Sequence, residues 1–352
     1  MMRFLRDTHV ICLIYDGIKN SVFKSQVLQP LLAELDANKG LKITLISFER
    51  NAFNSQDLVW HDRLSVIILN RWLFFGRLSL VYAFWQCKKV LKGVVADCIL
   101  ARGPLAGAIA LDLIAGKRLK TTRCIIQARG LCAEEYRYAM RSKTSLSQRI
   151  RKKFVYHELE QLERCVYGKQ RKNIGYDITI EAVSPALKDY LVDRYQAEEK
   201  SIVIAYVDLP CAIIPATRAL FRRELRRKLG IAEDARVYCY SGSYKPWQGV
   251  KESLDYFCHH ASKDAYALLL ILSPDQNQFD RELKSYGLSP HHYRILNVDP
   301  CQVLTYLCAA DYGFLFRDND CINWVSRPTK MLEYQAAGLS IIHNHTVAWL
   351  CQ

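Results

Sequence analysis

The chain has 352 residues, a length that suits two domains better than a single hydrophobic core. Half of the residues are hydrophobic, which excludes an intrinsically disordered protein. Lys and Arg outnumber Asp and Glu by 33 to 20 in residues 1–200, a net charge of +13, but only by 16 to 15 in residues 201–352, a net charge of +1. A basic surface concentrates polyanions, so nucleic acid, anionic lipid and acidic substrates all remain open as partners.

The thirteen cysteines do not have metal-ligand spacing, because no pair stands in a C-x-x-C arrangement. Cysteines scattered in this way are expected to be buried as small hydrophobic residues. Unpaired cysteines in this number also indicate a reducing compartment. Arg3 and Arg6 interrupt the first residues before an apolar core of useful length, so no secretory signal is expected. The apolar stretch Trp72–Cys87 is shorter than the roughly 20 residues of a membrane span and contains Arg77. The sequence therefore predicts a cytoplasmic protein that does not cross the membrane.

Apolar runs alternate with helical patterns along the whole chain, which predicts parallel sheets covered by helices. The first strand, Val10–Tyr15, is continuously apolar and breaks at Asp16 and Gly17, where a glycine would let the backbone approach a ligand. Later strands are predicted at Ile43–Phe48, Val66–Leu69, Cys98–Ala101, Cys124–Ala128, Ile178–Val183, Val237–Ser241, Ala267–Leu272, Tyr293–Val298, Gly313–Phe316 and Ser340–His343. The fold class is therefore α/β.

Charged residues follow two neighbouring strands of the N-terminal half, in ILARGPLAGAIAL and IIQARGLCAEEY. Arg102, Arg129 and Glu134 are thereby expected at the carboxyl ends of adjacent strands, where α/β proteins bind ligands. An ordinary salt bridge of Arg129 with Glu134 or Glu135 explains the same pattern almost equally well.

The stretch Arg71–Lys92 mixes aromatic and basic residues, which is the chemistry of a helix lying at a membrane surface. A helix packed on a sheet has the same composition, so both interpretations stay open. Arg149–Lys153 is the next basic candidate for such a surface.

The domains are predicted to meet near Pro210 and Pro215, as residues 1–205 and 206–352. In the second domain, VYCYSGSYKPWQGV reads as a strand, a turn of small residues and a helix from about Gln248, with Lys245 as the only cation of the turn.

The segment from Asp311 to Asn344 predicts a strand, a polar loop, a helix and a second strand. Pro328 is expected at the first helical position, and Gly338 just after the last. A helix N-terminus offers unpaired N–H groups and partial positive charge to an anion. The polar side chains gathered around this junction are Arg317, Asn323, Ser326, Lys330 and Glu333.

The run SRPTKMLEYQAAGLSII resembles the C-terminal signature of family-4-type glycosyltransferases, nucleotide-sugar enzymes with two facing Rossmann-like domains (the GT-B fold). The resemblance implies that Glu333 binds the donor ribose and that Ser326 and Lys330 surround the diphosphate. Val325 stands where two-glutamate relatives have an acidic residue, so that contact to the sugar is expected either to be absent or to be supplied elsewhere, with Asn323 and Arg317 as the candidates.

The upstream turn is similar to that family's Gly-Arg, Lys-Gly turn, and Gly242 and Gly249 are retained as donor-side residues. Ser243 stands at the arginine position and Gln248 at the lysine position. The resemblance therefore leaves Lys245, together with Lys330, to stabilise the leaving diphosphate.

For the N-terminal domain, the resemblance implies that the Gly17 loop touches the donor phosphates or the acceptor, and that Arg102, Arg129 and Glu134 lie on the acceptor side. Relatives continue past the strand Ser340–His343, so the C-terminal domain is expected to be incomplete.

The resemblance implies a glycosyltransferase that moves a sugar from a nucleotide-sugar donor to a glycan or lipid-linked acceptor in surface-polysaccharide assembly. Retention of configuration is expected, with no metal and no cofactor, at the cytoplasmic face of an anionic membrane. The alternatives are a nucleotide-sugar epimerase of the same fold, a catalytically impaired binding fragment and, least favoured, a nucleic-acid-binding protein.

Overall fold

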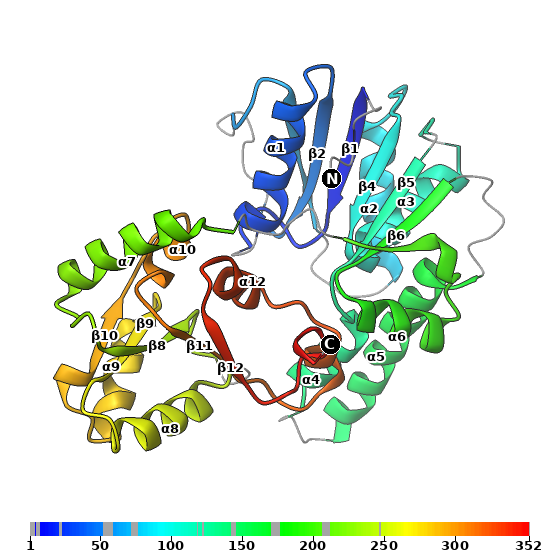
Figure 1. Ribbon diagram of the computed structural model, residues 1–352. Helices are drawn as coiled ribbons and strands as arrows, with labels where there is room; N and C mark the ends of the chain where they lie inside the picture. Colours follow the sequence, from blue (N-terminus) through cyan, green and yellow to red (C-terminus); the bar gives the residue numbers. More distant parts are fainter. Residues whose placement is uncertain are drawn as a thin grey trace. The chain divides into compact units, whose positions relative to one another are not determined.

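The computed structural model describes residues 4, 8–20, 23–51, 59–71, 77–117, 119–121, 123–141, 146–169, 177–205, 212–245 and 248–351, without the side chains of residues 77 and 146–148. The chain separates into two compact units, Met1–Asp208 and Leu209–Gln352. Each unit has its own parallel sheet (Figure 1).

Unit 1 contains a seven-stranded sheet in the order β3-β2-β1-β4-β5-β6-β7, and all of its pairs are parallel. Its strands are β1 (His9–Ile14), β2 (Lys42–Glu49), β3 (Leu64–Asn70), β4 (Cys98–Arg102), β5 (Arg123–Ala128), β6 (Asp177–Ala182) and β7 (Ile202–Ile204). Its α-helices are α1 (Gln29–Ala37), α2 (Arg77–Val90), α3 (Gly103–Ala115), α4 (Cys132–Ala139), α5 (Leu146–Tyr167) and α6 (Pro185–Tyr195).

The core of unit 1 lies on both faces of this sheet, which explains why β1 is apolar after His9 and β4 is apolar up to Arg102. On one face, Leu31 and Leu35 of α1 pack with Cys12 and Ile14 of β1. On the other face, α3 contacts β1, β4 and β5 and is flanked by α2 and α5.

Unit 2 contains a five-stranded parallel sheet in the order β10-β9-β8-β11-β12. Its strands are β8 (Arg236–Ser241), β9 (Ala267–Leu272), β10 (Tyr293–Leu296), β11 (Tyr312–Leu315) and β12 (Ser340–His343). Its α-helices are α7 (Pro215–Leu229), α8 (Val250–Ala261), α9 (Gln276–Ser285), α10 (Val303–Leu307), α11 (Cys321–Trp324) and α12 (Thr329–Ala336).

Two apolar clusters sandwich the sheet of unit 2. Leu225 of α7 and Tyr334 of α12 belong to the cluster on one face, and Phe257 of α8 and Phe279 of α9 belong to the cluster on the other. Helices thus cover both faces, and the predicted α/β class is confirmed.

The order of both sheets reverses once. The reversal lies between β1 and β4 in unit 1 and between β8 and β11 in unit 2, because these neighbours are not consecutive in the chain. Parallel strands leave a crevice at such a point, beyond their carboxyl ends. The residues that follow β8 and β11 are therefore the expected ligand site of unit 2.

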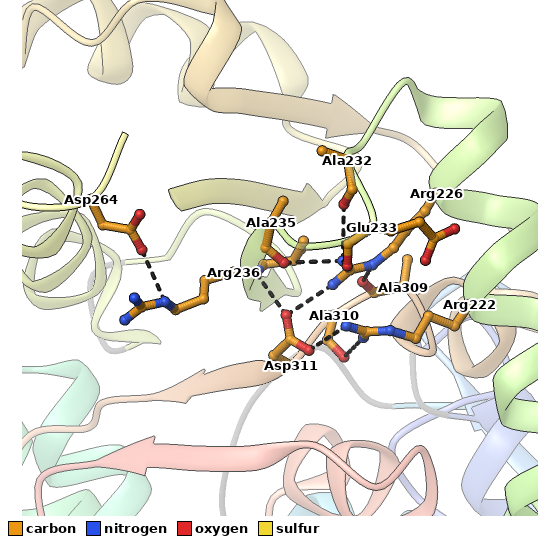
Figure 2. Close-up of polar contacts among 11 residues, drawn as sticks. Arg222, Arg226, Ala232, Glu233, Ala235, Arg236, Asp264, Ala309, Ala310 and Asp311 are labelled. Carbon is orange, nitrogen blue, oxygen red and sulfur yellow. Dashed lines mark hydrogen bonds and ion pairs between the residues drawn. The ribbon is translucent and has the colours of Figure 1, made fainter. Parts of the chain in front are cut away.

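The opposite end of the unit 2 sheet is closed by an internal polar network (Figure 2). The side chain of Arg226 is completely buried and donates hydrogen bonds to four backbone carbonyls and to Asp311 Oδ2, the last at 2.9 Å. Asp311 also pairs with Arg222 at 2.7 Å and accepts the Val237 N–H at 2.9 Å. At this end of the sheet, Arg222 and Arg226 thus have both hydrogen-bond acceptors and a counter-ion within the protein.

The helix α12 differs from prediction in one detail. Pro328 is not its first helical residue but its N-cap, with an extended backbone, and the helix begins at Thr329. The predicted end is confirmed, since Gly338 follows the last turn with φ of +69°, a conformation that glycine adopts without strain.

Candidate functional site

The helix α12 directs three side chains of one face toward the carboxyl ends of β8 and β11. Lys330, Glu333 and Tyr334 are spaced i, i+3 and i+4, so they lie together on the helix surface. The Lys-x-x-Glu-Tyr pattern therefore places these three side chains side by side on one face of the helix.

Tyr334 fixes the helix to the sheet. Its ring covers Gly313 of β11 so closely that a β-carbon there would stand 2.5 Å from the ring. Its hydroxyl accepts a hydrogen bond of 3.0 Å from the backbone N–H of Ser241, the last residue of β8. Tyr334 is therefore a structural residue that sets the position of Lys330 and Glu333.

Lys330 has a buried side chain for which the described part of the chain offers no hydrogen-bond partner. Its side chain is 7 % exposed, and Nζ lies 4.5 Å from the centre of the Tyr240 ring. A β-carbon on Gly242 would stand 3.7 Å from Nζ, so the ammonium reaches the end of β8. No acceptor in the described ranges forms a hydrogen bond with Nζ.

The electrostatics around Lys330 favour an incoming anion. Burial lowers the pKa of Lys330 well below its ordinary value, the positive charge of Arg317 lowers it further, and Glu333 offsets only part of this effect. Burial also raises the pKa of Glu333 above its ordinary value. The charges of Arg317 and Glu333 thus act on Lys330 in opposite senses, and a phosphate beside Lys330 would stabilise its charged form.

The loop after β11 carries two further predicted residues. Asn323 is buried, and its Nδ2 donates to the Asp318 carbonyl at 3.0 Å, while Ser326 Oγ donates to the Asn323 carbonyl at 2.8 Å. Both side chains are engaged in shaping this loop. Arg317 stands at its beginning, and its backbone is held by Asn344, a residue that sequence reasoning missed.

Hydrogen bonds to backbone groups, together with two glycines, fix the loop after β8. Gly242 has φ of +131° and donates its N–H to the Leu272 carbonyl at 2.9 Å. The Ser243 carbonyl accepts the Tyr240 hydroxyl at 3.0 Å. Gly249 caps α8 with φ of +60°, and a β-carbon there would stand 2.4 Å from the Phe316 carbonyl oxygen. The two retained glycines therefore bring this loop against the sheet.

Lys245 lies on the same loop with an exposed side chain. Its backbone carbonyl accepts the Gln248 N–H at 2.9 Å. The exposed side chain of Lys245 contrasts with the buried side chain of Lys330. The structure thus brings Lys330, Arg317 and Glu333 together and leaves Lys245 at the rim of unit 2.

In unit 1, Gly17 follows β1 with φ of +81°. The close approach that its sequence pattern predicts is made by the protein itself, since a β-carbon there would stand 2.6 Å from Glu49 Oε2. The buried Glu49 carboxylate accepts the Ile18 N–H at 2.6 Å and the Ser47 hydroxyl at 2.7 Å.

The carboxyl ends of β4 and β5 bring Arg102 and Arg129 together as predicted, and both line a small pocket beside Gln26 and Gln127. Arg102 is buried, and its Nη2 donates to Gln26 Oε1 at 2.6 Å.

Glu134 does not face this pocket's arginines. Its buried carboxylate accepts the Tyr156 hydroxyl of α5 at 2.8 Å and pairs with Arg137 on its own helix. Its neighbour Glu135 packs against Gly130 instead, because a β-carbon there would stand 2.3 Å from Glu135 Oε1. Spacing alone could not decide which of the two glutamates turns back toward the strand.

Across the part of the chain that the structure describes, no group of three or more His, Cys, Asp or Glu residues could hold a metal ion. Over the same residues, no helix has the length and apolar character needed to cross a bilayer.

Comparison with known proteins identifies the fold. No protein-family model matches the sequence, and no curated protein matches it either. Among solved structures, the chain is similar to WaaG, a glycosyltransferase involved in lipopolysaccharide biosynthesis, with a TM-score of 0.62 and 15 % identity over 97 % of this chain and 82 % of that one.

Two further structures have a similar match. The lipopolysaccharide outer core galactosyltransferase WaaB gives a TM-score of 0.60 and 12 % identity over 95 % of this chain and 80 % of that one. The catalytic domain of starch synthase IV from Arabidopsis thaliana, bound to ADP and acarbose, gives 0.60 and 13 % over 98 % and 84 %. The chain therefore has the GT-B fold that its sequence predicts.

Proposed function

We propose that this protein is a glycosyltransferase that uses a nucleotide-sugar donor, with the donor diphosphate bound in unit 2 beside Lys330. The observation that carries this proposal is the buried amino group of Lys330, which lies at the reversal point of the sheet and has no hydrogen-bond acceptor among the residues that the structure describes. A buried cation without a partner is costly, and an anionic ligand removes that cost.

The neighbouring groups suit the rest of a nucleoside diphosphate. Arg317 supplies a second positive charge close to Lys330, and the half-buried Glu333 offers a carboxylate to the ribose hydroxyls. The N-terminal turn of α12 adds backbone N–H groups and the positive end of its dipole. Lys245, Asn323, Ser326, Gly242 and Ser243 complete the proposed donor side.

Stabilisation of the leaving diphosphate is then the main catalytic task of unit 2, carried by Lys330 and Lys245. The departing phosphate oxygens take the proton of the acceptor hydroxyl, so retention of configuration needs no separate side-chain base. We assign the acceptor to unit 1, near Arg102 and Arg129. The lipopolysaccharide enzymes of the same fold support a surface glycan or lipid-linked acceptor.

Docking on an anionic membrane is part of the same proposal. Helices α2, α3 and α5 of unit 1 enclose a mostly apolar groove of about 410 Å³, whose lining also includes Asp112 and Glu158. Val81 of α2 and Phe154 of α5 stand on its rims, 61 % and 64 % exposed. Exposed cations flank the rims along both helices: Lys88, Lys89, Arg149, Arg151 and Lys153. Apolar side chains beside cations are typical of surfaces that lie on anionic lipid.

The test begins with thermal unfolding of the full chain in the presence of each common nucleotide sugar and nucleoside diphosphate, since a ligand that binds only the native state raises its stability. The donor found in this way is then incubated with glycan acceptors. Transfer supports the proposal, whereas release of a free epimerised sugar without an acceptor identifies an epimerase. Stabilisation by single-stranded nucleic acid alone would overturn the assignment.

A further inference from the structure

The ladder between β11 and β12 stops at the pair Leu315 and His343. Beyond this point, the side chain of Asn344 bonds both backbone groups of Arg317. The Arg317 N–H donates to Asn344 Oδ1 at 3.3 Å, and Asn344 Nδ2 donates to the Arg317 carbonyl at 2.7 Å. A primary amide carries one acceptor and one donor group, so it can replace a neighbouring strand for one residue.

The orientation of this amide follows from the backbone of Arg317, whose N–H can only donate and whose carbonyl can only accept. The hydroxyl of the buried Thr346, which can do both, donates to the same Asn344 Oδ1 at 2.8 Å. Between them, His345 adopts the left-handed conformation with φ of +59°, an uncommon state for a residue with a β-carbon. This turn lets Thr346 reach back to Asn344.

The backbone around Arg317 is thereby held from two sides. Asn344 bonds its N–H and carbonyl, and the preceding Phe316 carbonyl packs against Gly249 of the β8–α8 loop. The guanidinium of Arg317 in turn acts on Lys330, whose pKa it lowers. We infer that Asn344 is a positioning residue, which keeps Arg317 beside Lys330 so that both cations face one anion.

This inference rests on the proposed function for the identity of the anion, a nucleoside diphosphate, but its geometry stands on the protein alone. Asn344→Leu removes both hydrogen bonds to Arg317. Asn344→Asp keeps an acceptor and places a carboxylate oxygen against the Arg317 carbonyl in place of the donor. Gln276→Ala is the matched control, because Gln276 Nε2 donates to the Ile295 carbonyl at 3.1 Å at the end of another strand, β10.

The first measurement needs no ligand. The nitrogen chemical shift of each lysine Nζ is followed by NMR across pH, and the Lys330 signal is identified by its loss in Lys330→Met. Release of Arg317 weakens the repulsion between the two cations, so the pKa of Lys330 rises in both Asn344 variants and stays unchanged in Gln276→Ala. An unchanged pKa of Lys330 in folded Asn344 variants would overturn the inference.

The second measurement is calorimetric binding of the nucleoside diphosphate and of the nucleoside alone. With Asn344→Leu, the diphosphate binds roughly tenfold more weakly while the nucleoside is unaffected, as expected for one displaced charged contact. A wild-type protein that binds no nucleoside diphosphate contradicts the proposed function, and the NMR titration then still decides the role of Asn344. Binding by wild type that Asn344→Leu leaves intact would contradict the positioning role itself.

Discussion

The ammonium of Lys330 lies 4.5 Å from the centre of the Tyr240 ring, within the range of a cation–π contact. A ring face lowers the energy of a cation without neutralising it, so the ammonium can be kept at the end of β8 while the place of an acceptor is left for a ligand. Burial and Arg317 together keep the pKa of Lys330 low in the ligand-free protein.

Lys330→Met should weaken nucleoside diphosphate binding about ten- to a hundredfold, the usual worth of a charge-assisted hydrogen bond in a buried site. The binding should also take up a proton, because a bound diphosphate raises the lowered pKa of Lys330. Calorimetry in buffers of different ionisation enthalpy measures this uptake. It should be largest between the two pKa values of Lys330 and smaller in Lys330→Met.

Glu333→Gln should weaken binding of the nucleotide by roughly tenfold or more, since a carboxylate accepts hydrogen bonds from ribose hydroxyls better than an amide does. The check is calorimetry with a nucleoside diphosphate and its 2′,3′-dideoxy analogue. The wild type should prefer the ribonucleotide, and Glu333→Gln should lose that preference. Equal discrimination by both proteins would assign the ribose to another residue.

Lys245→Ala should weaken binding of a nucleoside diphosphate much more than binding of the nucleoside, if this exposed lysine reaches the phosphates from the rim. Lys251→Ala, on the exposed surface of the neighbouring helix α8, is the matched control. Should the two ligands be affected equally, Lys245 does not contact the diphosphate.

Asp311→Ala should lower the free energy of unfolding by about 3–5 kcal/mol, because it leaves the completely buried Arg226 without its counter-ion. Arg236→Ala breaks an ion pair of 3.0 Å with Asp264 at the same end of the sheet, but Arg236 is mostly exposed, so a loss of at most about 1 kcal/mol is expected. Chemical denaturation of both variants compares these values. Similar losses of free energy in the two variants would contradict the role of Asp311 as the counter-ion that the buried Arg226 requires.

Membrane docking should require both charge and the apolar groove. Lys88, Lys89 and Lys92 replaced by Gln should reduce sedimentation with anionic vesicles, and high salt should do the same to the wild type, because surface cations are screened. Phe154→Ser should weaken the salt-resistant part, with Val203→Ser, at an exposed position of β7, as the control. Negligible sedimentation with anionic and neutral vesicles at low salt would refute the docking surface.

The strands were predictable because buried parallel strands are continuously apolar. Ala267–Leu272 is buried along its whole length and begins and ends where the sequence predicts. The edge strand Ser340–His343 also has its predicted bounds, although it is only partly buried. The start of the last α-helix was predicted to within one residue, because a proline marks it. Strand bounds and helix starts depend on residues that are close together in the chain, so the sequence alone can predict them.

The rest of the site depends on contacts between distant segments. Asn344 bonds Arg317 across 27 residues, and Glu49 fills the space beside Gly17 from another strand. A glycine signals that something approaches closely, but it does not say whether that is a ligand or another side chain. For the same reason, the sequence could not show that Lys330, rather than Lys245, is the buried cation.

The polar network at the amino ends of β8 and β11 affects how fast an anion binds at their carboxyl ends. Arg222 and Arg226 are paired there with Asp311, and residues 201–352 carry a net charge of only +1. This part of the chain attracts a nucleotide little from beyond a Debye length of about 8 Å at physiological salt, so any change of the association rate with ionic strength should come from the basic residues 1–200. Selectivity for the diphosphate would then be expressed in the dissociation rate, after the ligand has reached Lys330.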